Sequence, residues 1–232
     1  MIKRLFEKHE TLFCVALIVL YVAVNSACLQ SFGTTDIRCA LVNTVFSVLL
    51  IGLTLHLKRA SYYGLQCVKE PKKYIYFLPL ALLASVNLWG GIHVNNTASE
   101  ILFHVVTMIN VGFIEEMIFR GYLYRMMEKS NPKSAAIVSA VTFGIGHIVN
   151  LLNGAELVPT LLQLCYAVAI GWLFVVIFRK SKSLVPCIIT HAVLNALSVF
   201  SAESDVLNYA GSALLVAVSL GYAAYINKRV KA

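Results

Sequence analysis

Charged residues are scarce in this sequence. Of its 232 residues only 13% are Asp, Glu, Lys or Arg, whereas 59% are hydrophobic; a soluble domain carries about a quarter charged residues. So little charge leaves too little polar surface to cover an apolar core in water. Together with a mean hydropathy of +0.78, this composition excludes an ordinary soluble domain and indicates a protein embedded in a membrane.

Motifs of several common site types are also missing. The six cysteines form no CxxC pair and most lie in apolar runs, which is typical of small packing residues rather than of a disulfide framework or a zinc knuckle. The HExxH pattern of zinc proteases is absent, and no Ser has a matched His and Asp partner. The cysteines are Cys14, Cys28, Cys39, Cys67, Cys165 and Cys187.

Eight apolar runs have the length of a transmembrane helix, which is about 17 to 25 residues. The runs are 11–29, 40–57, 74–92, 101–127, 135–152, 157–178, 184–200 and 206–226. The first run lacks a small-residue cleavage site, so we interpret it as a span rather than a signal peptide. We predict an all-α, polytopic membrane protein with about eight transmembrane helices in a single domain, residues 1–232, with no linker and no internal repeat.

The basic residues collect in alternate loops. If the N-terminus is cytoplasmic and the chain crosses eight times, 17 of the 19 lie on the cytoplasmic side, as the positive-inside rule requires. Those 17 are Lys3, Arg4, Lys8, Lys58, Arg59, Lys69, Lys72, Lys73, Arg125, Lys129, Lys133, Arg179, Lys180, Lys182, Lys228, Arg229 and Lys231. The outer loops instead carry Asp36, Glu100, Glu156, Glu203 and Asp205. We therefore predict cytoplasmic N- and C-termini, and the anionic inner leaflet of the bilayer, not a nucleic acid, explains the net charge of +8.

Three of the predicted spans contain polar residues that are costly inside a bilayer, and such residues usually mark function. They are Glu115, Glu116 and Arg120 in the run 101–127, His147 in the run 135–152, where the aromatic Phe143 lies four residues before it, and His191 and Asn195 in the run 184–200. Within each run two of these residues are four apart, so they lie on one helical face. Glu115 is about 100° around the helix from Glu116, so the two carboxylates cannot share one partner in the same way. We predict that the three runs bring these side chains to one site.

The predicted site has the groups needed to hydrolyse a peptide bond. A carboxylate beside an imidazole in a low-dielectric pocket can take a proton from water, which then attacks a carbonyl carbon. His191 and Asn195 can supply two hydrogen-bond donors to the resulting oxyanion. Glu115, His147 and His191 could alternatively be ligands of a catalytic zinc ion with an open position. A transporter or proton relay would also bury such residues, but the sequence has no inverted halves with matching Gly or Pro breaks.

In these motifs the chain resembles the CAAX protease and bacteriocin-processing (CPBP, or Abi) family of intramembrane endopeptidases, whose pattern is EExxxR, FxxxH and HxxxN in this order. The resemblance covers about residues 101–200. It implies eight helices around a conical cavity open to the cytoplasm and the membrane. It also implies that Glu115 and His147 activate water, that His191 and Asn195 bind the oxyanion, and that Glu116 and Arg120 hold the site. On the family's glutamate-type assignment we favour metal-free chemistry, with zinc as the alternative cofactor.

The substrate class follows from the resemblance only in outline. Some relatives cleave prenylated C-terminal tails, others process peptide pheromones or bacteriocin leaders, and some act as immunity factors. The small size and short loops are typical of a bacterial plasma-membrane protein, and bacteria generally lack prenylated CAAX proteins. We therefore expect a peptide or membrane-protein substrate, with a non-catalytic immunity or scaffold protein as the alternative. The oligomeric state is not predicted.

Four histidines lie outside the motifs, and we interpret them as structural. They are His9, His56, His93 and His104. His104 lies eleven residues before Glu115, near the same helical face and three turns away, so it is the one with a candidate supporting or water-access role.

Overall fold

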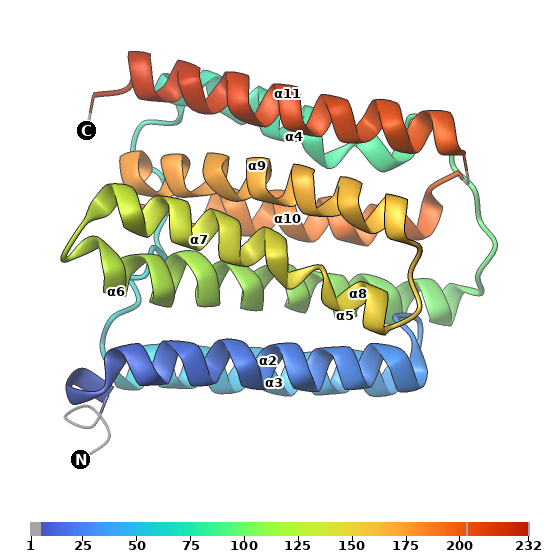
Figure 1. Ribbon diagram of the computed structural model, residues 1–232, viewed down its shortest axis with the longest axis horizontal. Coiled ribbons are helices and arrows are strands. Elements are labelled where there is room, and N and C mark those ends of the chain that lie inside the picture. Colours follow the sequence, from blue (N-terminus) through green and yellow to red (C-terminus); the bar gives the residue numbers. More distant parts are fainter. Residues whose placement is uncertain (1–5, 203, 232) are drawn as a thin grey trace.

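The structure is a computed structural model that describes residues 6–202 and 204–231; Lys3, Arg4 and Glu203 of the charge pattern lie outside these residues. All secondary structure in the described residues is helical. The helices run side by side in layers: α2 and α3 form one outer layer, α4 and α11 form the opposite one, and α5, α7, α9 and α10 lie between them (Figure 1). The molecule is therefore all-α, as predicted.

Among the residues that the structure describes, six helical segments are long and apolar enough to cross a membrane, and the chain is a multi-pass integral membrane protein. The long helices are α2 (Glu10–Phe32), α3 (Ile37–His56), α5 (Ala98–Glu116) continued by the π-helix η3 (Met117–Tyr124) and by α6 (Arg125–Glu128), α7 (Pro132–Gly146) followed by α8 (Val149–Leu152), α9 (Leu157–Ser181) and α11 (Asp205–Arg229). Each coincides with one of the predicted runs within a few residues.

The other two predicted runs form shorter segments. The run 184–200 becomes α10 (Val185–Ala196) and the 3-10 turn η4 (Leu197–Phe200). The run 74–92 is divided among η1 (Pro71–Phe77), α4 (Leu78–Ala84) and η2 (Val86–Leu88).

The expectation of one continuous helix over 74–92 is wrong, and the backbone shows why. Ile75, Tyr76 and Phe77 have φ of 52°, 49° and 58°, a left-handed conformation that is unfavourable for L-residues and above all for β-branched ones. The α-helix therefore begins only at Leu78, with Pro79 in its first turn, where a missing N–H costs nothing.

Polar residues between the spans fix the helix starts. The Asp36 side chain accepts a hydrogen bond from the Arg38 backbone N–H at the start of α3, and Asn131 caps α7 in the same way. Thr97 and Glu100 form a reciprocal capping box at the start of α5. These caps satisfy N–H groups that lack a partner in the first turn of a helix.

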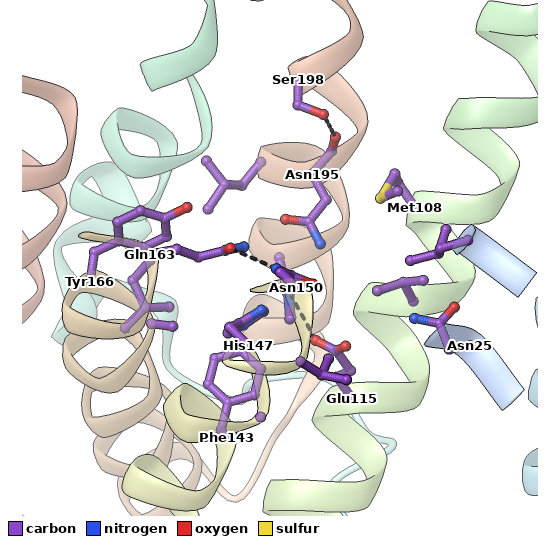
Figure 2. Close-up of a pocket in the computed structure, with 18 of the residues that line it drawn as sticks. Asn25, Met108, Glu115, Phe143, His147, Asn150, Gln163, Tyr166, Asn195 and Ser198 are labelled. Carbon is purple, nitrogen blue, oxygen red and sulfur yellow. Dashed lines mark hydrogen bonds and ion pairs between the residues drawn. The ribbon is translucent and has the colours of Figure 1, made fainter. Parts of the chain in front are cut away.

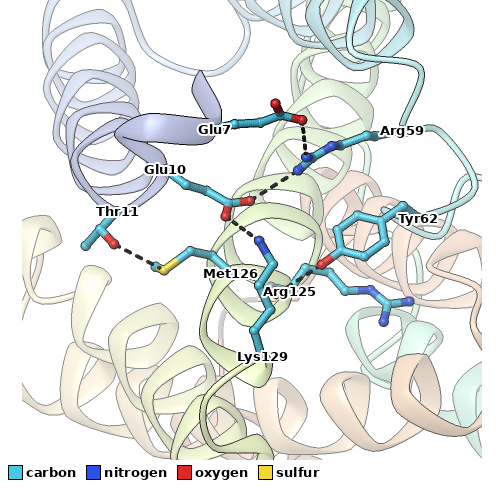
Figure 3. Close-up of polar contacts among 8 residues, drawn as sticks. All are labelled: Glu7, Glu10, Thr11, Arg59, Tyr62, Arg125, Met126 and Lys129. Atoms are coloured by element: carbon cyan, nitrogen blue, oxygen red, sulfur yellow. Dashed lines mark hydrogen bonds and ion pairs between the residues drawn. The ribbon is translucent and has the colours of Figure 1, made fainter. Parts of the chain in front are cut away.

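A cluster of charged residues gathers at one end of the bundle (Figure 3). Arg59, which follows α3, lies 3.0 Å from Glu7 and 3.3 Å from Glu10. Lys129, just after α6, also pairs with Glu10. These contacts tie the start of α2 to the end of the long α5–α6 segment.

Two glycines allow the helices that carry the motifs to approach closely. A Cβ atom on Gly112 would lie 2.7 Å from the backbone nitrogen of Ala192, so α5 and α10 touch through their backbones. A Cβ atom on Gly144 would lie 2.3 Å from Val168 Cγ2, which brings α7 equally close to α9. Small residues at such crossings are typical of packed membrane helices.

Candidate functional site

The imidazole of His191 lies between the two carboxylates of α5. Its Nδ1 is 2.9 Å from Glu116 Oε1, and its Nε2 is 3.5 Å from Glu115 Oε2. Their separation of about 100° around the helix predicts that the two carboxylates cannot share one partner in the same way. They do contact the same ring, but through different nitrogens. Because an ionised carboxylate only accepts hydrogen bonds, Nδ1 carries a hydrogen and donates it to Glu116.

Glu116 also forms the ion pair with Arg120 that their four-residue spacing suggested. Arg120 Nη1 lies 3.0 Å from Glu116 Oε1, and both side chains are completely buried. The guanidinium stacks 4.1 Å from the ring centroid of Phe143. A Cβ atom at Gly171 would lie 2.9 Å from Arg120 Nη2, so that glycine makes room for the guanidinium. Phe143 thereby has a structural part in the site through a cation–π contact.

The helix changes its winding at this pair. The π-helix η3 begins at Met117, directly after the two glutamates, contains Arg120, and is buried along its whole length. Ser139 of α7 donates a hydrogen bond of 2.8 Å to the Phe119 carbonyl, which satisfies a polar backbone group within this segment. Single π-turns inside α-helices occur frequently at functional sites.

A cavity of about 340 Å³ lies beside this cluster. Glu115, His147, His191 and Asn195, the four residues predicted to be catalytic, all line it. Figure 2 shows Glu115, His147 and Asn195 around the same space. Glu116 and Arg120 do not line the cavity.

His147 reaches the cavity from the end of α7. It is the C-cap residue of that helix, and its ring packs edge-on against Phe143 with the centroids 5.3 Å apart. The same Phe143 ring also lies 5.6 Å from that of His191. Phe143 is thus the common packing partner of both motif histidines.

The structure adds a residue that the sequence analysis did not single out. Tyr21 of α2 donates a 3.0 Å hydrogen bond from its hydroxyl to Glu115 Oε1. Its only sequence signal is a phenol within a largely apolar run.

The cavity is also lined by uncharged amides. Asn25, Asn150 and Gln163 line it, and Asn150 donates a 2.8 Å hydrogen bond to Gln163. The dashed line between these two side chains can be followed in Figure 2. The cavity therefore offers neutral hydrogen-bonding groups beside the carboxylate and the imidazoles.

The alternative zinc ligands are not drawn together around one point in the described residues. Within residues 6–202 and 204–231, no three or more His, Cys, Asp or Glu side chains are grouped so that they could hold a metal ion. Glu115, His147 and His191 line one cavity, yet His191 is already engaged by both glutamates.

Comparison with known proteins identifies the segment that carries the site. Residues 97–197 match the family model described as type II CAAX prenyl endopeptidase Rce1-like. No curated protein and no solved structure matches the chain. The matched segment begins at the N-cap of α5, ends just after α10, and contains all the motif residues. Over residues 97–197 the chain is therefore similar to the Rce1-like family of type II CAAX prenyl endopeptidases, in agreement with the resemblance of its three motifs.

Proposed function

We propose that this protein is an intramembrane endopeptidase that hydrolyses a peptide bond of a peptide or membrane-protein substrate in the cavity beside Glu115. One observation carries the proposal: a carboxylate and an imidazole, Glu115 and His191, lie 3.5 Å apart at the wall of one cavity, and the far side of the imidazole is held by a buried ion pair. Buried ionisable groups that line a cavity in a membrane protein are candidates for chemistry.

In the proposed reaction Glu115, with His147 beside it, takes a proton from a water molecule. The water oxygen forms a bond to the carbonyl carbon of the substrate, and the carbonyl oxygen becomes an oxyanion. The proton then passes from Glu115 to the leaving amine nitrogen as the C–N bond breaks. No cofactor is needed for this sequence of steps.

The oxyanion is stabilised by His191 and Asn195 in this proposal. With Nδ1 donating to Glu116, His191 can donate from Nε2 only as an imidazolium. The Glu116 carboxylate, at 2.9 Å, stabilises that cation. The side-chain amide of Asn195 supplies the second donor. Glu116 and Arg120 are positioning residues, because they act through His191.

We further propose the topology of about eight spans with both termini in the cytoplasm, in the plasma membrane of a bacterium. α2 begins and α11 ends at the same end of the bundle (Figure 1), which fits an even number of crossings. Arg59 and Lys129 meet Glu10 at the end where α2 begins, in agreement with a basic cytoplasmic side. In this proposal α4 and α10 complete the bundle, and residues 1–232 form one transmembrane domain with its motifs within about 101–200.

The family description refers to prenylated CAAX substrates, whereas we propose an unprenylated peptide or a membrane-protein segment. The short loops that suggest a bacterial protein support this choice, since bacteria generally lack prenylated CAAX proteins. The neutral amides of the cavity wall, such as Asn150 and Gln163, suit the N–H and C=O groups of a peptide backbone.

The proposal is tested by comparing peptides in cells that carry the wild-type protein or Glu115→Gln, using mass spectrometry. We expect at least one product to disappear and its precursor to accumulate. Glu100→Gln is the matched control, since it lies on the same helix and Gln preserves its capping role. Identical peptide profiles in all three strains would instead favour a non-catalytic immunity or scaffold protein.

A further inference from the structure

A histidine outside the three motifs touches the backbone of Asn195. His104 of α5 is 5% exposed. Its Nε2 lies 3.2 Å from the Asn195 carbonyl oxygen, and its Nδ1 lies 2.9 Å from Thr34 Oγ1. Ser198 Oγ donates a 2.7 Å hydrogen bond to the same Asn195 carbonyl and lies 3.2 Å from His104 Nε2.

These contacts determine which ring nitrogen carries the hydrogen. A carbonyl oxygen only accepts, so Nε2 of His104 carries a hydrogen and donates it to Asn195. Nδ1 is then free to accept a hydrogen bond from the Thr34 hydroxyl. The neutral ring in its Nε2–H form satisfies both contacts at once.

The Asn195 carbonyl lies where the helix changes. α10 ends at Ala196 and the chain continues as the 3-10 turn η4 from Leu197. Carbonyls in the last turn of a helix lose their regular partners and need others. His104 and Ser198 supply them, and so hold the backbone of the residue whose amide faces the cavity; the bond from Ser198 is visible in Figure 2.

We propose that His104 is a positioning residue of the protease site. Its Nε2–H holds the Asn195 carbonyl and thereby aims the Asn195 amide at the oxyanion. The inference rests on the proposed function, and it extends the site to a third histidine, which none of the three motifs contains. Thr34, in the turn between α2 and α3, holds the other side of the ring.

The two ring nitrogens can be tested separately by substitution. Glutamine can place a donor near the position of Nε2, whereas asparagine reaches only the position of Nδ1. We therefore expect His104→Gln to keep most of the activity, and His104→Asn and His104→Leu to lower kcat with little change in KM. The loss should be about tenfold to a hundredfold, the effect of a misplaced catalytic group.

The assay uses the purified full chain and a synthetic peptide that spans the cleavage site found by comparing the wild type with Glu115→Gln. A double variant with Asn195→Ala completes the design. If His104 acts through Asn195, His104→Asn should lower kcat no further once the Asn195 amide is gone. Melting temperatures of all variants separate loss of positioning from loss of folding.

Several results would overturn the inference. One is a His104→Asn variant that is as active as the wild type, together with an inactive His104→Gln variant. That result would assign the effect of His104 on activity to its contact with Thr34. Another is that His104→Asn lowers kcat by the same factor in the Asn195→Ala variant as in the wild type. Failure of the proposed function is distinguishable, because then Glu115→Gln itself leaves processing intact. A ¹⁵N NMR spectrum of labelled histidines gives a readout without activity: the His104 signals should be those of a neutral ring with hydrogen on Nε2.

Discussion

Among single residues, Glu115 and Glu116 are neighbours in sequence with different surroundings. Glu116 is fully buried against Arg120 and His191, whereas Glu115 lines the cavity and bonds to Tyr21. Two carboxylates and one guanidinium leave one negative charge in this cluster, beside the ring of His191. A buried net charge is costly, so this cluster favours the uptake of a proton, which is the step that we propose for Glu115.

Replacing Glu116 should damage the fold more than replacing Glu115. In Glu116→Gln the buried Arg120 loses its ionic partner, and breaking a buried pair in this way costs about 3 to 5 kcal/mol. Glu115→Gln keeps an oxygen that can accept from Tyr21, so its melting temperature should stay near that of the wild type. Thermal unfolding in detergent, followed by tryptophan fluorescence, compares the two.

In activity per folded molecule, Glu115→Gln should be the more damaging of the two substitutions. Glu115→Gln should lose about a hundredfold or more, the usual contribution of a general base. A stable Glu116→Gln together with an unstable Glu115→Gln would contradict the separation of roles that we propose.

Stringent chelation tests the choice between metal-free and zinc-dependent hydrolysis. We expect full activity after treatment with a strong zinc chelator, because Glu115 and the imidazoles perform every proposed step. Elemental analysis of the purified protein should be made on the same sample. Stoichiometric zinc that is needed for turnover would contradict metal-free chemistry and return the three alternative ligands, Glu115, His147 and His191, to consideration.

At the scale of helices, the contact of α5 with α10 sets the distance between Glu115 and His191. The backbones touch where Gly112 faces Ala192, next to His191 in sequence. Gly112 also lies three residues before Glu115 on the same helix, so this contact determines how closely the two motifs approach.

Gly112→Ala should therefore separate the motifs. Its Cβ would lie 2.7 Å from a backbone nitrogen, which side-chain motion cannot relieve, and such overpacking costs about 1 to 3 kcal/mol. Both melting temperature and activity should fall. Gly52→Ala in α3 is the matched control, since a Cβ there meets nothing within 4 Å and alanine favours the helix by up to about 1 kcal/mol. Equal behaviour of the two variants would refute the close-contact argument.

The length of the apolar runs predicted the long helices, because a membrane-spanning helix requires only a sufficiently long apolar stretch. It did not predict the break in the run 74–92, where the left-handed turn at Ile75 to Phe77 overrides a continuous apolar pattern. Motif spacing indicated the convergence of Glu115, His147, His191 and Asn195 on one cavity. It could not identify Tyr21, because a lone polar residue on another helix acquires its partner only through tertiary packing.

An exposed cysteine can report the orientation of the whole molecule in the membrane. Cys67 is exposed and lies in the basic segment 58–73, which we propose to be cytoplasmic. A membrane-impermeant maleimide should label it in inside-out vesicles and leave it unlabelled in intact cells. The experiment uses a protein with Cys165→Ser, since Cys165 is also exposed; in that background Cys67→Ser should abolish the label and serves as the control. Labelling of Cys67 in intact cells would contradict cytoplasmic termini.

The hydrogen bond from Tyr21 to Glu115 crosses the boundary of the family match. The match begins at residue 97, yet α2 contributes Tyr21 and Asn25 to the wall of the cavity. A fragment cut to residues 97–197 would contain every motif and still leave Glu115 without its phenol partner, with the cavity open on one side. The smallest unit with a complete cavity is thus longer than the matched segment, and truncation studies should retain the first two helices.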